Sequence, residues 1–493
     1  MKRASACVTL VALVLAGCEV GPDYVTPDMA VPRKYSDLPM TAASAPISVP
    51  SASQADLSAW WTQFHDAELD SLIARAMAAN LDLLTAASRV REARQQEIEA
   101  GAAALPKVDA SAFAAHLHSN AGLESVLGGP PSGEGFDTKL YSLGFDATWE
   151  VDIFGGVRRS VEAAHDTREA ALWDMRDGEV TLTAEIAADY LTLRALQAQI
   201  ALLQDEAKRQ TDTLVFIRAR RRAGFVTELD VNQQVALEES TVAQIPLLEA
   251  QAGAVEHAIA VLMAEPPDAV VAELERSAAR PVVPKTIPVG LPSVLLLRRP
   301  DVREAERKLA SATANIGVAV SDLYPKFDLL GGVSLASTHL SSLFTSNALA
   351  EGGAGSITWP IFEGGQIRAN IHAKTDEADQ AYFAYKKTIL TALQDVEDSL
   401  LRYEKDQPRL LALERAATSA RSSSDIAYQQ YRVGLTPYVN VLTAQANDLS
   451  AEVQLEQGRE ALTTDLVSLY KALGGGWSMP DPKLGPPPDR TKG

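Results

Sequence analysis

Few residues of this 493-residue chain could do enzymatic chemistry. His116 and His118 would point to one face of a strand and could bind a metal ion, but no third ligand lies near them in the sequence. Gly133-Glu134-Gly135 is not followed by a helix of the type that a nucleotide-binding fingerprint requires. The sequence has no HExxH motif, phosphate-binding loop or nucleophile elbow. We therefore expect no catalytic residue, no metal and no cofactor, and we do not expect an enzyme.

Both cysteines lie within the first 18 residues, so the folded body can have no disulfide, cysteine-based zinc site or thiol nucleophile. Two basic residues are followed by an apolar run too short to span a bilayer, which ends in Leu15-Ala16-Gly17-Cys18. This pattern resembles a lipobox, in which residues 1–17 are a signal peptide and Cys18 receives a covalent lipid. The alternative is ordinary secretory cleavage near Ala16, which would leave Cys18 as a free thiol. Glu19 favours the outer membrane, because an aspartate there would favour retention in the inner membrane.

The composition excludes other classes of protein. The chain is 46% hydrophobic and 22% charged, which suffices for a large core. Its 45 basic and 64 acidic residues give a net charge of −19, which argues against a nucleic-acid partner because phosphate binding needs a basic surface. No run of 18 apolar residues follows the first 20 positions, so a bundle of membrane-spanning helices is excluded.

The chain contains an internal repeat. Leu-Pro-Lys-Val-Asp at 105–109 recurs as Tyr-Pro-Lys-Phe-Asp at 324–328, and Arg222-Ala223-Gly224 recurs as Arg432-Val433-Gly434. Each copy predicts a helix, two strands, a long helix and a returning helix. The expected divisions are a signal peptide (1–17), a lipid-anchored N-terminal segment (18–59), a first repeat (60–264), a linker (265–298), a second repeat (299–474) and a flexible tail (475–493).

Alternation of apolar and polar residues predicts the strands. Residues 139–149 have one largely apolar face over about ten residues, the length that a tilted strand needs to cross a bilayer. Residues 327–336 alternate in the same way, and a fourth strand is predicted at 355–361. Residues 108–118 are rich in alanine and are predicted as a strand mainly because their repeat partner is one.

The helices follow a different period. Apolar residues from Leu182 to Leu203 recur every 3.5 residues on average, which is coiled-coil spacing, and 389–403 repeat this pattern. Long helices are predicted over 156–224 and 365–434, each on the order of 100 Å at about 1.5 Å per residue. Pro408 predicts a kink or break in the second. Shorter helices are expected at 66–105 and 301–323, and from the two glycine turns to Leu262 and Leu473.

Four strands cannot close a barrel by themselves. An open sheet edge in lipid leaves backbone groups unpaired, at several kcal/mol each, so the strands must be shared among copies of the chain. Eight strands are about the practical minimum, and a dimer, a trimer or a tetramer would all reach it.

The sequence is similar to the TolC-type outer-membrane efflux proteins, in particular to their lipoprotein (NodT-like) branch. Residues 18–24 resemble the mature start of that branch, Trp60 to Leu83 its entry helix, and Arg298-Arg299-Pro300-Asp301-Val302 a motif of its second repeat. The resemblance implies a mainly α fold with membrane β-strands. Three protomers would form a 12-stranded β-barrel in the outer membrane of a Gram-negative cell, continued by a 12-helix α-barrel in the periplasm.

The resemblance also implies a function and partners. Such homotrimers sit among outer-membrane lipids and passively conduct drugs or other small molecules that an inner-membrane RND pump delivers through a periplasmic adaptor (membrane fusion) protein. One alternative is the exit duct of a type I protein or peptide secretion system, which shares the fold. Another is a periplasmic scaffold lipoprotein without a pore, which would have no need of alternating strands.

Gate residues can be transferred from the family position by position. Asp230 and Tyr431 match a pair that bonds one tip hairpin to another and holds the tunnel shut. Thr436 stands where some members have an arginine that reinforces this latch. The pore-narrowing aspartates of the family fall at Asn440 and Thr443, which are uncharged, so Asp230 would be the main acidic group at the gate.

The resemblance places the adaptor-docking tips at the two glycine turns. Their residues are Arg222, Gly224 and Phe225 in the first tip, and Arg432, Gly434 and Leu435 in the second. Arg218, Arg220 and Arg221 also crowd the first turn, either for docking or as cations favoured near a helix C-terminus.

Two aromatic pairs stand where strands leave the membrane. Trp149 with Phe154, and Trp359 with Phe362, fit an aromatic belt at the membrane interface. Packing at the joint between strand and helix explains the same residues, and the two roles do not exclude each other.

Overall fold

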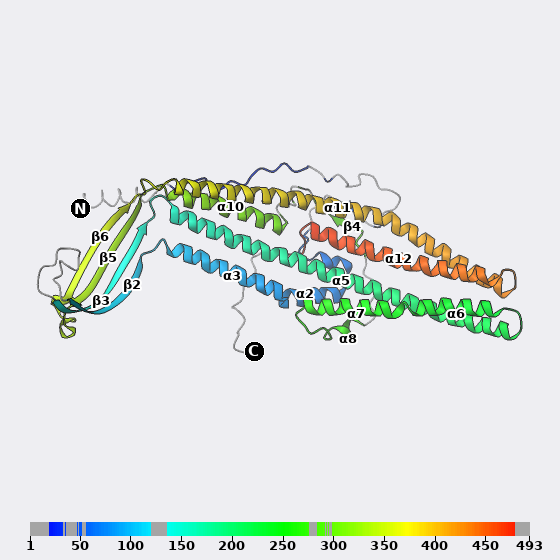
Figure 1. Cartoon of the computed structure of the whole chain (residues 1–493). Helices are drawn as coiled ribbons and strands as arrows, with labels where there is room; N and C mark the ends of the chain where they lie inside the picture. Colours follow the sequence, from blue (N-terminus) through cyan, green and yellow to red (C-terminus); the bar gives the residue numbers. More distant parts are fainter. Residues whose placement is uncertain are drawn as a thin grey trace. The chain divides into compact units, whose positions relative to one another are not determined.

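The computed structural model describes residues 19–32, 35, 47, 49–51, 56–119, 136–275, 283–290, 292, 294 and 298–478. The predictions for Cys18, the signal peptide and the loop at 122–135 lie outside the described residues. The chain divides into two compact units, each assembled from three segments (Figure 1). The sheet unit comprises Met1–Pro27, Arg91–Ala170 and Ala305–Ala384, and the helical unit comprises Asp28–Val90, Ala171–Glu304 and Tyr385–Gly493.

The described elements are mostly helical, as expected. In chain order they are β1 (Val49–Ser51), η1 (Trp60–Phe64), α2 (Ala67–Ala79), α3 (Leu81–Ala102), β2 (Lys107–Ser119), β3 (Phe136–Val151), α5 (Gly156–Arg222), α6 (Glu228–Val242), α7 (Ile245–Leu262), α8 (Val271–Leu274), β4 (Thr286–Pro288), α10 (Pro300–Ser321), β5 (Lys326–Ser337), η2 (Leu340–Ser342), η3 (Ser346–Ala348), β6 (Leu349–Thr358), α11 (Gln366–Arg432) and α12 (Tyr438–Ala472). The long helices α5 and α11 each have 67 residues and contribute to both units.

The sheet unit contains one four-stranded antiparallel sheet in the order β2-β3-β5-β6. Its register aligns Ala110 with Phe145 and Phe145 with Val333, so these side chains share one face, which is largely apolar and exposed. The opposite face carries Asp109 and Asp146, which are also paired. Among the described residues, β2 and β6 each have only one strand partner, so both edges of the sheet are open.

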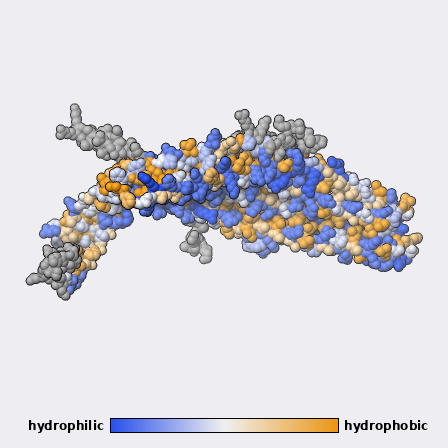
Figure 2. Space-filling model, turned by 45° about the horizontal axis from the view of Figure 1, so that its top comes forward, coloured by the Kyte–Doolittle hydropathy of each residue, from blue (hydrophilic) through white to orange (hydrophobic). Residues whose placement is uncertain are grey.

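The joint between sheet and helices is apolar at its surface. Figure 2 shows hydrophobic side chains gathered where the strands give way to helices. Trp359, Ile361 and Phe362 are among the exposed large apolar residues of this region.

The helical unit is held by the predicted apolar stripes. Ile186, Tyr190 and Leu193 of α5 are buried, and so are Val396 and Tyr403 of α11. The 3.5-residue spacing therefore marks packed faces of the long helices, as expected for coiled-coil contacts.

An aromatic cluster closes the core of the helical unit near the end of the described chain. Trp60 stacks on Tyr470 with ring centroids 4.9 Å apart, and it meets Phe64 edge to face. The backbone N–H of Gly476 donates to the carbonyl of Leu57 at 2.9 Å, which holds the chain after α12 against the entry segment.

Three predicted helices differ from the structure. The helix expected at 66–105 is two helices, because Asn80 breaks it and its side chain accepts from the N–H groups of Asp82 and Leu83, at 2.9 and 3.0 Å. The returning helix to Leu262 is divided at 243–244, where Pro246 cannot donate the backbone bond that would continue it. In contrast, α11 continues through Pro408, so no break occurs there.

The strands are confirmed, with one wrong boundary. The fourth strand was expected at 355–361 but runs Leu349–Thr358. Its last pair is Lys326 with Thr358, and Pro325, which precedes Lys326, has no N–H to extend the ladder.

One helical stretch of the described chain, Glu228–Leu262, has the length and apolar composition that a membrane span requires. It coincides with α6 and α7 of the helical unit. A single stretch of this kind does not form a bundle of membrane-spanning helices.

Candidate functional site

The two glycine turns of the helical unit have the same backbone. Gly224 and Gly434 have φ angles of +79° and +80°, in the left-handed region that favours glycine. The N–H of Phe225 donates to the carbonyl of Arg220 at 2.9 Å, and the N–H of Leu435 donates to that of Gln430 at 2.8 Å. These bonds close a Schellman motif at the end of each long helix.

The returning helices begin differently. Thr227 is the N-cap of α6 and forms a capping box, because its hydroxyl accepts from the N–H of Asp230 while the Asp230 carboxylate accepts from the N–H of Thr227 at 2.8 Å. Pro437 is the N-cap of α12 and provides no side-chain cap. Of these two helices, α6 therefore has a side-chain N-cap and α12 does not.

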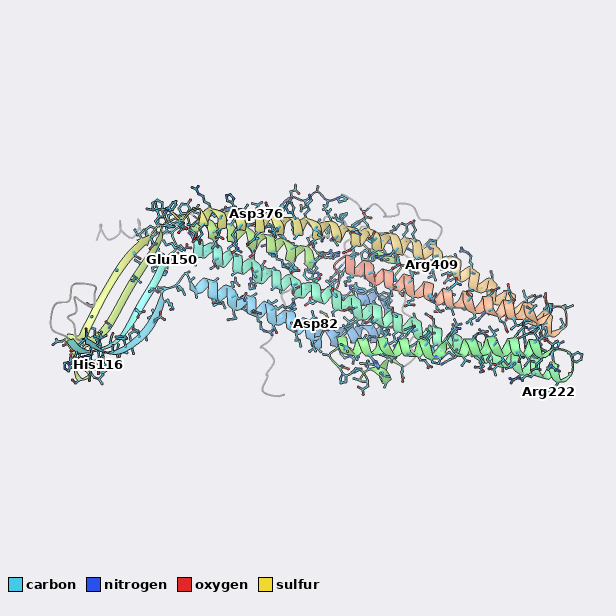
Figure 3. The ribbon with its side chains drawn as sticks, in the orientation of Figure 1. Asp82, His116, Glu150, Arg222, Asp376 and Arg409 are labelled. Carbon is cyan, nitrogen blue, oxygen red and sulfur yellow. The ribbon has the colours of Figure 1, made fainter. Side chains whose placement is uncertain are left out.

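Both tips present apolar side chains to solvent. Phe225 is 73% exposed and Leu435 is 77% exposed, and Arg222 and Arg432 beside them are also exposed. Figure 3 shows Arg222 at the turn between α5 and α6. In many Schellman motifs the residue after the glycine packs against the helix. Phe225 and Leu435 are exposed instead, so their side chains are available to contact another molecule.

The predicted latch pair is not hydrogen-bonded within this chain. Asp230 accepts from both the N–H and the hydroxyl of Thr227, each at 2.8 Å. Tyr431 is buried, and its hydroxyl has no hydrogen-bond partner among the described residues. Burial raises the pKa of Tyr431, as does the nearby negative charge of Asp230, whereas Arg220 lowers it.

Sequence reasoning missed the distinct position of Arg220. Its guanidinium lies over the ring of Tyr431, 4.9 Å from the centroid, and donates to the Tyr431 carbonyl at 3.1 Å. Arg221 instead pairs with Glu228 at 3.3 Å, and Arg218 and Arg222 are exposed. The crowded arginines therefore have different partners, which a cluster of like residues in the sequence does not reveal.

The three uncharged gate positions lie together at the start of α12. Asn440 donates to the hydroxyl of Thr436 at 2.7 Å, and the Thr443 hydroxyl donates to the carbonyl of Val439 at 2.9 Å. Both side chains thus bond within their own segment. They supply no ionic group for binding a cation.

Both tryptophans of the predicted membrane interface bond to the turn that precedes their hairpin. Trp149 donates its indole N–H to the carbonyl of Ala104, and Trp359 donates to that of Leu323, each at 3.0 Å. Phe154 stacks on Tyr324 with centroids 4.6 Å apart, whereas Phe362 is almost fully exposed. Three of the four aromatic residues thus have a packing role at the joint.

The histidines have an acidic neighbour that sequence spacing could not show. Asp137, on the next strand, forms ion-pair contacts with the imidazoles of both His116 and His118. His116 lies at the end of the sheet far from Glu150, which is near the helices (Figure 3). No group of three or more ligands suited to a metal occurs within the described part of the chain.

The segment that follows Cys18 is held in the sheet unit by a buried arginine. Arg159 is 3% exposed at its side chain and contacts Glu19 at 3.3 Å, Asp23 at 2.5 Å and Glu162 at 2.7 Å. A Cβ on Gly21 would lie 2.4 Å from the Cα of Gly317, so glycine at position 21 allows this close approach.

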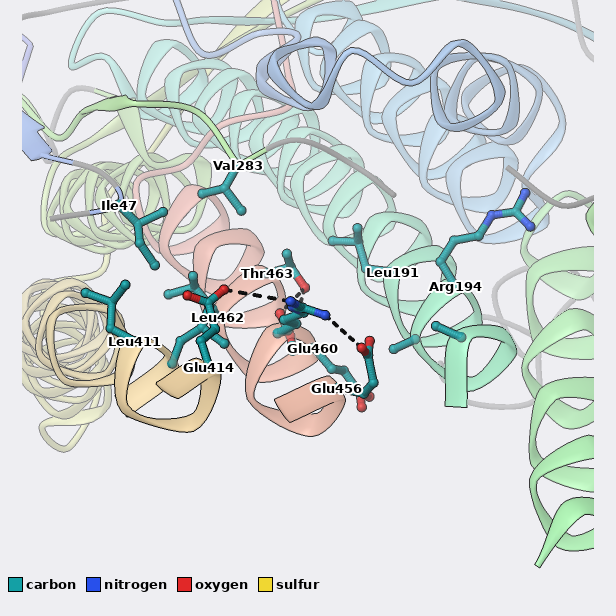
Figure 4. A pocket seen from close by; sticks show the side chains of 14 residues that line it. Ile47, Leu191, Arg194, Val283, Leu411, Glu414, Glu456, Glu460, Leu462 and Thr463 are labelled. Carbon is teal, nitrogen blue, oxygen red and sulfur yellow. Dashed lines mark hydrogen bonds and ion pairs between the residues drawn. The ribbon is translucent and has the colours of Figure 1, made fainter. Parts of the chain in front are cut away.

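A cavity of about 440 Å³ lies in the helical unit beside α5, α11 and α12 (Figure 4). Leu191, Leu411 and Leu462 give it an apolar lining. Arg459 pairs there with Glu456 at 2.8 Å and with Glu414 at 3.7 Å. Arg459, Glu456 and Glu414 are therefore paired with one another, whereas Arg194, which also lines the cavity, pairs with Glu68 of α2 at 2.5 Å.

Comparison with known proteins identifies the architecture. The model of the family "Outer membrane efflux protein" matches residues 72–265 and 291–475. Nodulation protein T of Rhizobium leguminosarum bv. viciae is 31% identical over 469 residues, which cover 95% of this chain and 92% of that protein. The pyoverdine export outer membrane protein OpmQ of Pseudomonas aeruginosa is 32% identical over 94% of this chain and 95% of its own length.

A solved structure agrees with these relatives. The outer-membrane channel OprN superposes with a TM-score of 0.86 at 33% identity, covering 93% of this chain and all of that one. The family is one of efflux proteins, OpmQ is an export protein and OprN is a channel, which agrees with the expectation from the sequence. The chain belongs to the outer membrane efflux protein family, and it is the outer-membrane channel component of an efflux system.

Proposed function

We propose that three copies of this chain assemble into one pipe, with a 12-stranded β-barrel in the outer membrane and a 12-helix barrel in the periplasm. The observation that carries this proposal is the sheet with two open edges, β2 and β6, because such edges must be paired in lipid. Pairing β2 of one copy with β6 of the next closes the sheet without a further element. Strands of 10 to 16 residues are long enough to cross the membrane at a tilt.

Each protomer is an internal two-fold repeat in this proposal. The order of helix, two strands, long helix and returning helix occurs twice, and both long helices have 67 residues. The repeats would occupy 60–264 and 299–474, joined by a linker at 265–298. The equal φ angles of Gly224 and Gly434 support the duplication.

The proposed partners would contact the tips of the helical unit and the segment after Cys18. A periplasmic adaptor would dock on the tips through Phe225 and Leu435, and an inner-membrane RND pump would deliver drugs or other small molecules to it. Covalent lipid on Cys18 would anchor the chain. The ion pairs of Arg159 with Glu19 and Asp23, which hold the segment after Cys18 in the sheet unit, support this proposal. No cofactor takes part, since conduction through the pipe is passive.

Conductance in planar bilayers tests the proposal. The full-length lipidated protein should give discrete single-channel currents, whereas a periplasmic scaffold would give none. Deletion of the gene should make cells sensitive to small toxic compounds. Loss of a secreted protein or peptide without such sensitivity would indicate secretion instead.

A further inference from the structure

The two hairpins of the helical unit meet below the tips in a buried cluster. The first hairpin is α5 with α6, and the second is α11 with α12. Their shared cluster contains Leu214, Ile217, Val231, Tyr431, Tyr438 and Val441. Most of these contacts are apolar and therefore have no fixed direction, so other contacts must fix how far one hairpin is shifted against the other.

Gln234 provides one directional contact. Its side chain is fully buried on α6, accepts a hydrogen bond from the hydroxyl of Tyr438 on α12, and donates to the carbonyl of Gln210 on α5 at 2.9 Å. A carbonyl can only accept, so the amide nitrogen must face Gln210 and the amide oxygen must face Tyr438. Displacing α12 along α6 would leave two buried polar groups unpaired.

The same contact continues along α5. The side chain of Gln210 is buried and donates to Glu206 at 3.0 Å. Glu206 is itself buried and pairs with Arg209. These bonds lie within α5 and hold the Gln210 side chain in place. The bond between Gln234 and Tyr438 joins the two hairpins, and a buried polar contact between helices can specify their register.

Arg220 provides a second contact, nearer the turn. Its planar guanidinium lies over the Tyr431 ring and also faces the rings of Phe216 and Phe225, at 5.8 and 5.9 Å. It donates to the carbonyl of Tyr431, the last but one residue of α11. One side chain of the first hairpin thereby binds both the ring and the backbone of the second.

We propose that Arg220 and Gln234 are the positioning residues that set how far the tip of the channel opens. The inference rests on the proposed channel function. Asn440 and Thr443 are neutral and Asp230 is engaged by Thr227, so an acidic latch does not hold the hairpins together within one copy. Among the described residues near the two turns, Arg220 and Gln234 form directional bonds between the hairpins, and opening the tip must break them.

The first test uses Gln234→Leu and Tyr438→Phe in the full-length protein. Each change removes one half of the same contact. Tyr438→Phe removes only one oxygen atom, so this variant should fold even if Gln234→Leu does not. In planar bilayers, each variant should raise the ratio of open to closed states about fivefold, the effect of losing one buried hydrogen bond. The double variant should gain little more, because both changes break the same bond.

The second test uses Arg220→Lys, with Arg218→Gln as the matched control. Lysine keeps the charge but not the planar face or the forked donors. Arg220→Lys should therefore open the channel, whereas Arg218→Gln, which alters an exposed arginine on the same helix, should not. Sensitivity of cells to a large glycopeptide antibiotic should rise with the first variant and stay unchanged with the second.

The outcomes separate the inference from the proposed function. If the unaltered protein conducts and the Arg220 and Tyr438 variants match it in conductance, the positioning roles are wrong even if melting temperatures fall. If the unaltered protein never conducts, the channel proposal fails and the inference fails with it. Increased conductance at an unchanged melting temperature supports the inference, because a purely structural role would lower stability alone.

Discussion

The two tips share a backbone but use equivalent positions for different contacts. Arg221 and Glu228 form an ion pair across the first turn, and the positions 210 residues later are Tyr431 and Tyr438, whose rings lie 5.1 Å apart. The ion pair is exposed, whereas both tyrosines are buried. The same turn geometry thus carries an exposed ion pair in the first tip and a buried pair of tyrosines in the second.

The difference shows what each tip contacts. The tyrosines belong to the cluster that joins the two hairpins, so the second turn is packed against the first. The ion pair lies on a side of the first turn that faces solvent within one copy. The two turns therefore have the same backbone but different contacts. The side chains at equivalent positions determine which turn packs against the other hairpin.

The largest contrast should come from truncating equivalent residues. Tyr438→Ala should lower the free energy of unfolding by about 3 kcal/mol, because it removes a buried ring. Glu228→Ala should cost less than about 0.5 kcal/mol, because exposed ion pairs contribute little. Urea unfolding of the detergent-solubilised protein, followed by circular dichroism at helical wavelengths, measures both. Equal losses would show that the two turns are energetically alike.

The two turn glycines should instead behave identically. Gly224→Ala and Gly434→Ala place a Cβ in the left-handed region, which costs about 1–2 kcal/mol, and no atom lies within 4 Å of either new Cβ. The same unfolding experiment should give equal losses. Gly253→Ala, within α7 and also without close neighbours, is the control and should not destabilise the protein. Unequal losses at the turns would mean that their surroundings, not their backbone, determine the cost.

A smaller difference should appear at the start of the returning helices. Thr227→Ala removes the capping box of the first tip and should cost about 1 kcal/mol. Asn440 is equivalent to Asp230 in the second tip, and its exposed side chain bonds to Thr436 and to no other side chain of the described residues. Asn440→Ala should therefore cost less than about 0.5 kcal/mol. Melting temperatures of the two variants measure the difference. A larger loss of stability from Asn440→Ala than from Thr227→Ala would contradict the conclusion that α6 is capped by a side chain and α12 is not.

The smallest effect should be on how the free energy of unfolding depends on pH, to which the two long helices contribute differently. Asp189 of α5 has a pKa raised from 3.8 to about 6 by burial and by Glu185, whereas the equivalent position of α11 is Ser399. Between these pH values the folded state binds more protons than the unfolded state, so the free energy of unfolding falls as pH rises. Asp189→Ser should make that fall shallower, by a small amount because solvent partly reaches the side chain. An unchanged slope would exclude a contribution from Asp189.

Much of the fold could be predicted from the sequence, because it depends on local periodicity. Alternation at 139–149 and the 3.5-residue spacing from Leu182 identify the strands and long helices directly, since the alternation marks one apolar face of a strand and the helical spacing marks one buried face of a helix. Most errors fall where one residue changes the backbone, whereas at Pro408 the residue expected to break α11 does not. Asn80 divides a continuous apolar pattern, and the ladder of β6 stops where β5 begins at Lys326.

The candidate site was less predictable, because its contacts join distant segments. Gly224 and Gly434 were identified by their motif, and their turn geometry is local. In contrast, nothing near Arg220 in the sequence distinguishes it from Arg218, since its partner Tyr431 is 211 positions away. Gln234 was missed because an apolar stripe does not reveal a polar residue whose partners lie on two other helices.

The number of chains in the particle tests the central claim most directly. Native mass spectrometry of the full-length protein, released gently from detergent, should give three chains per particle, because only shared strands pair the edges of β2 and β6. A particle with a single chain, folded and stable in the same detergent, would contradict the account.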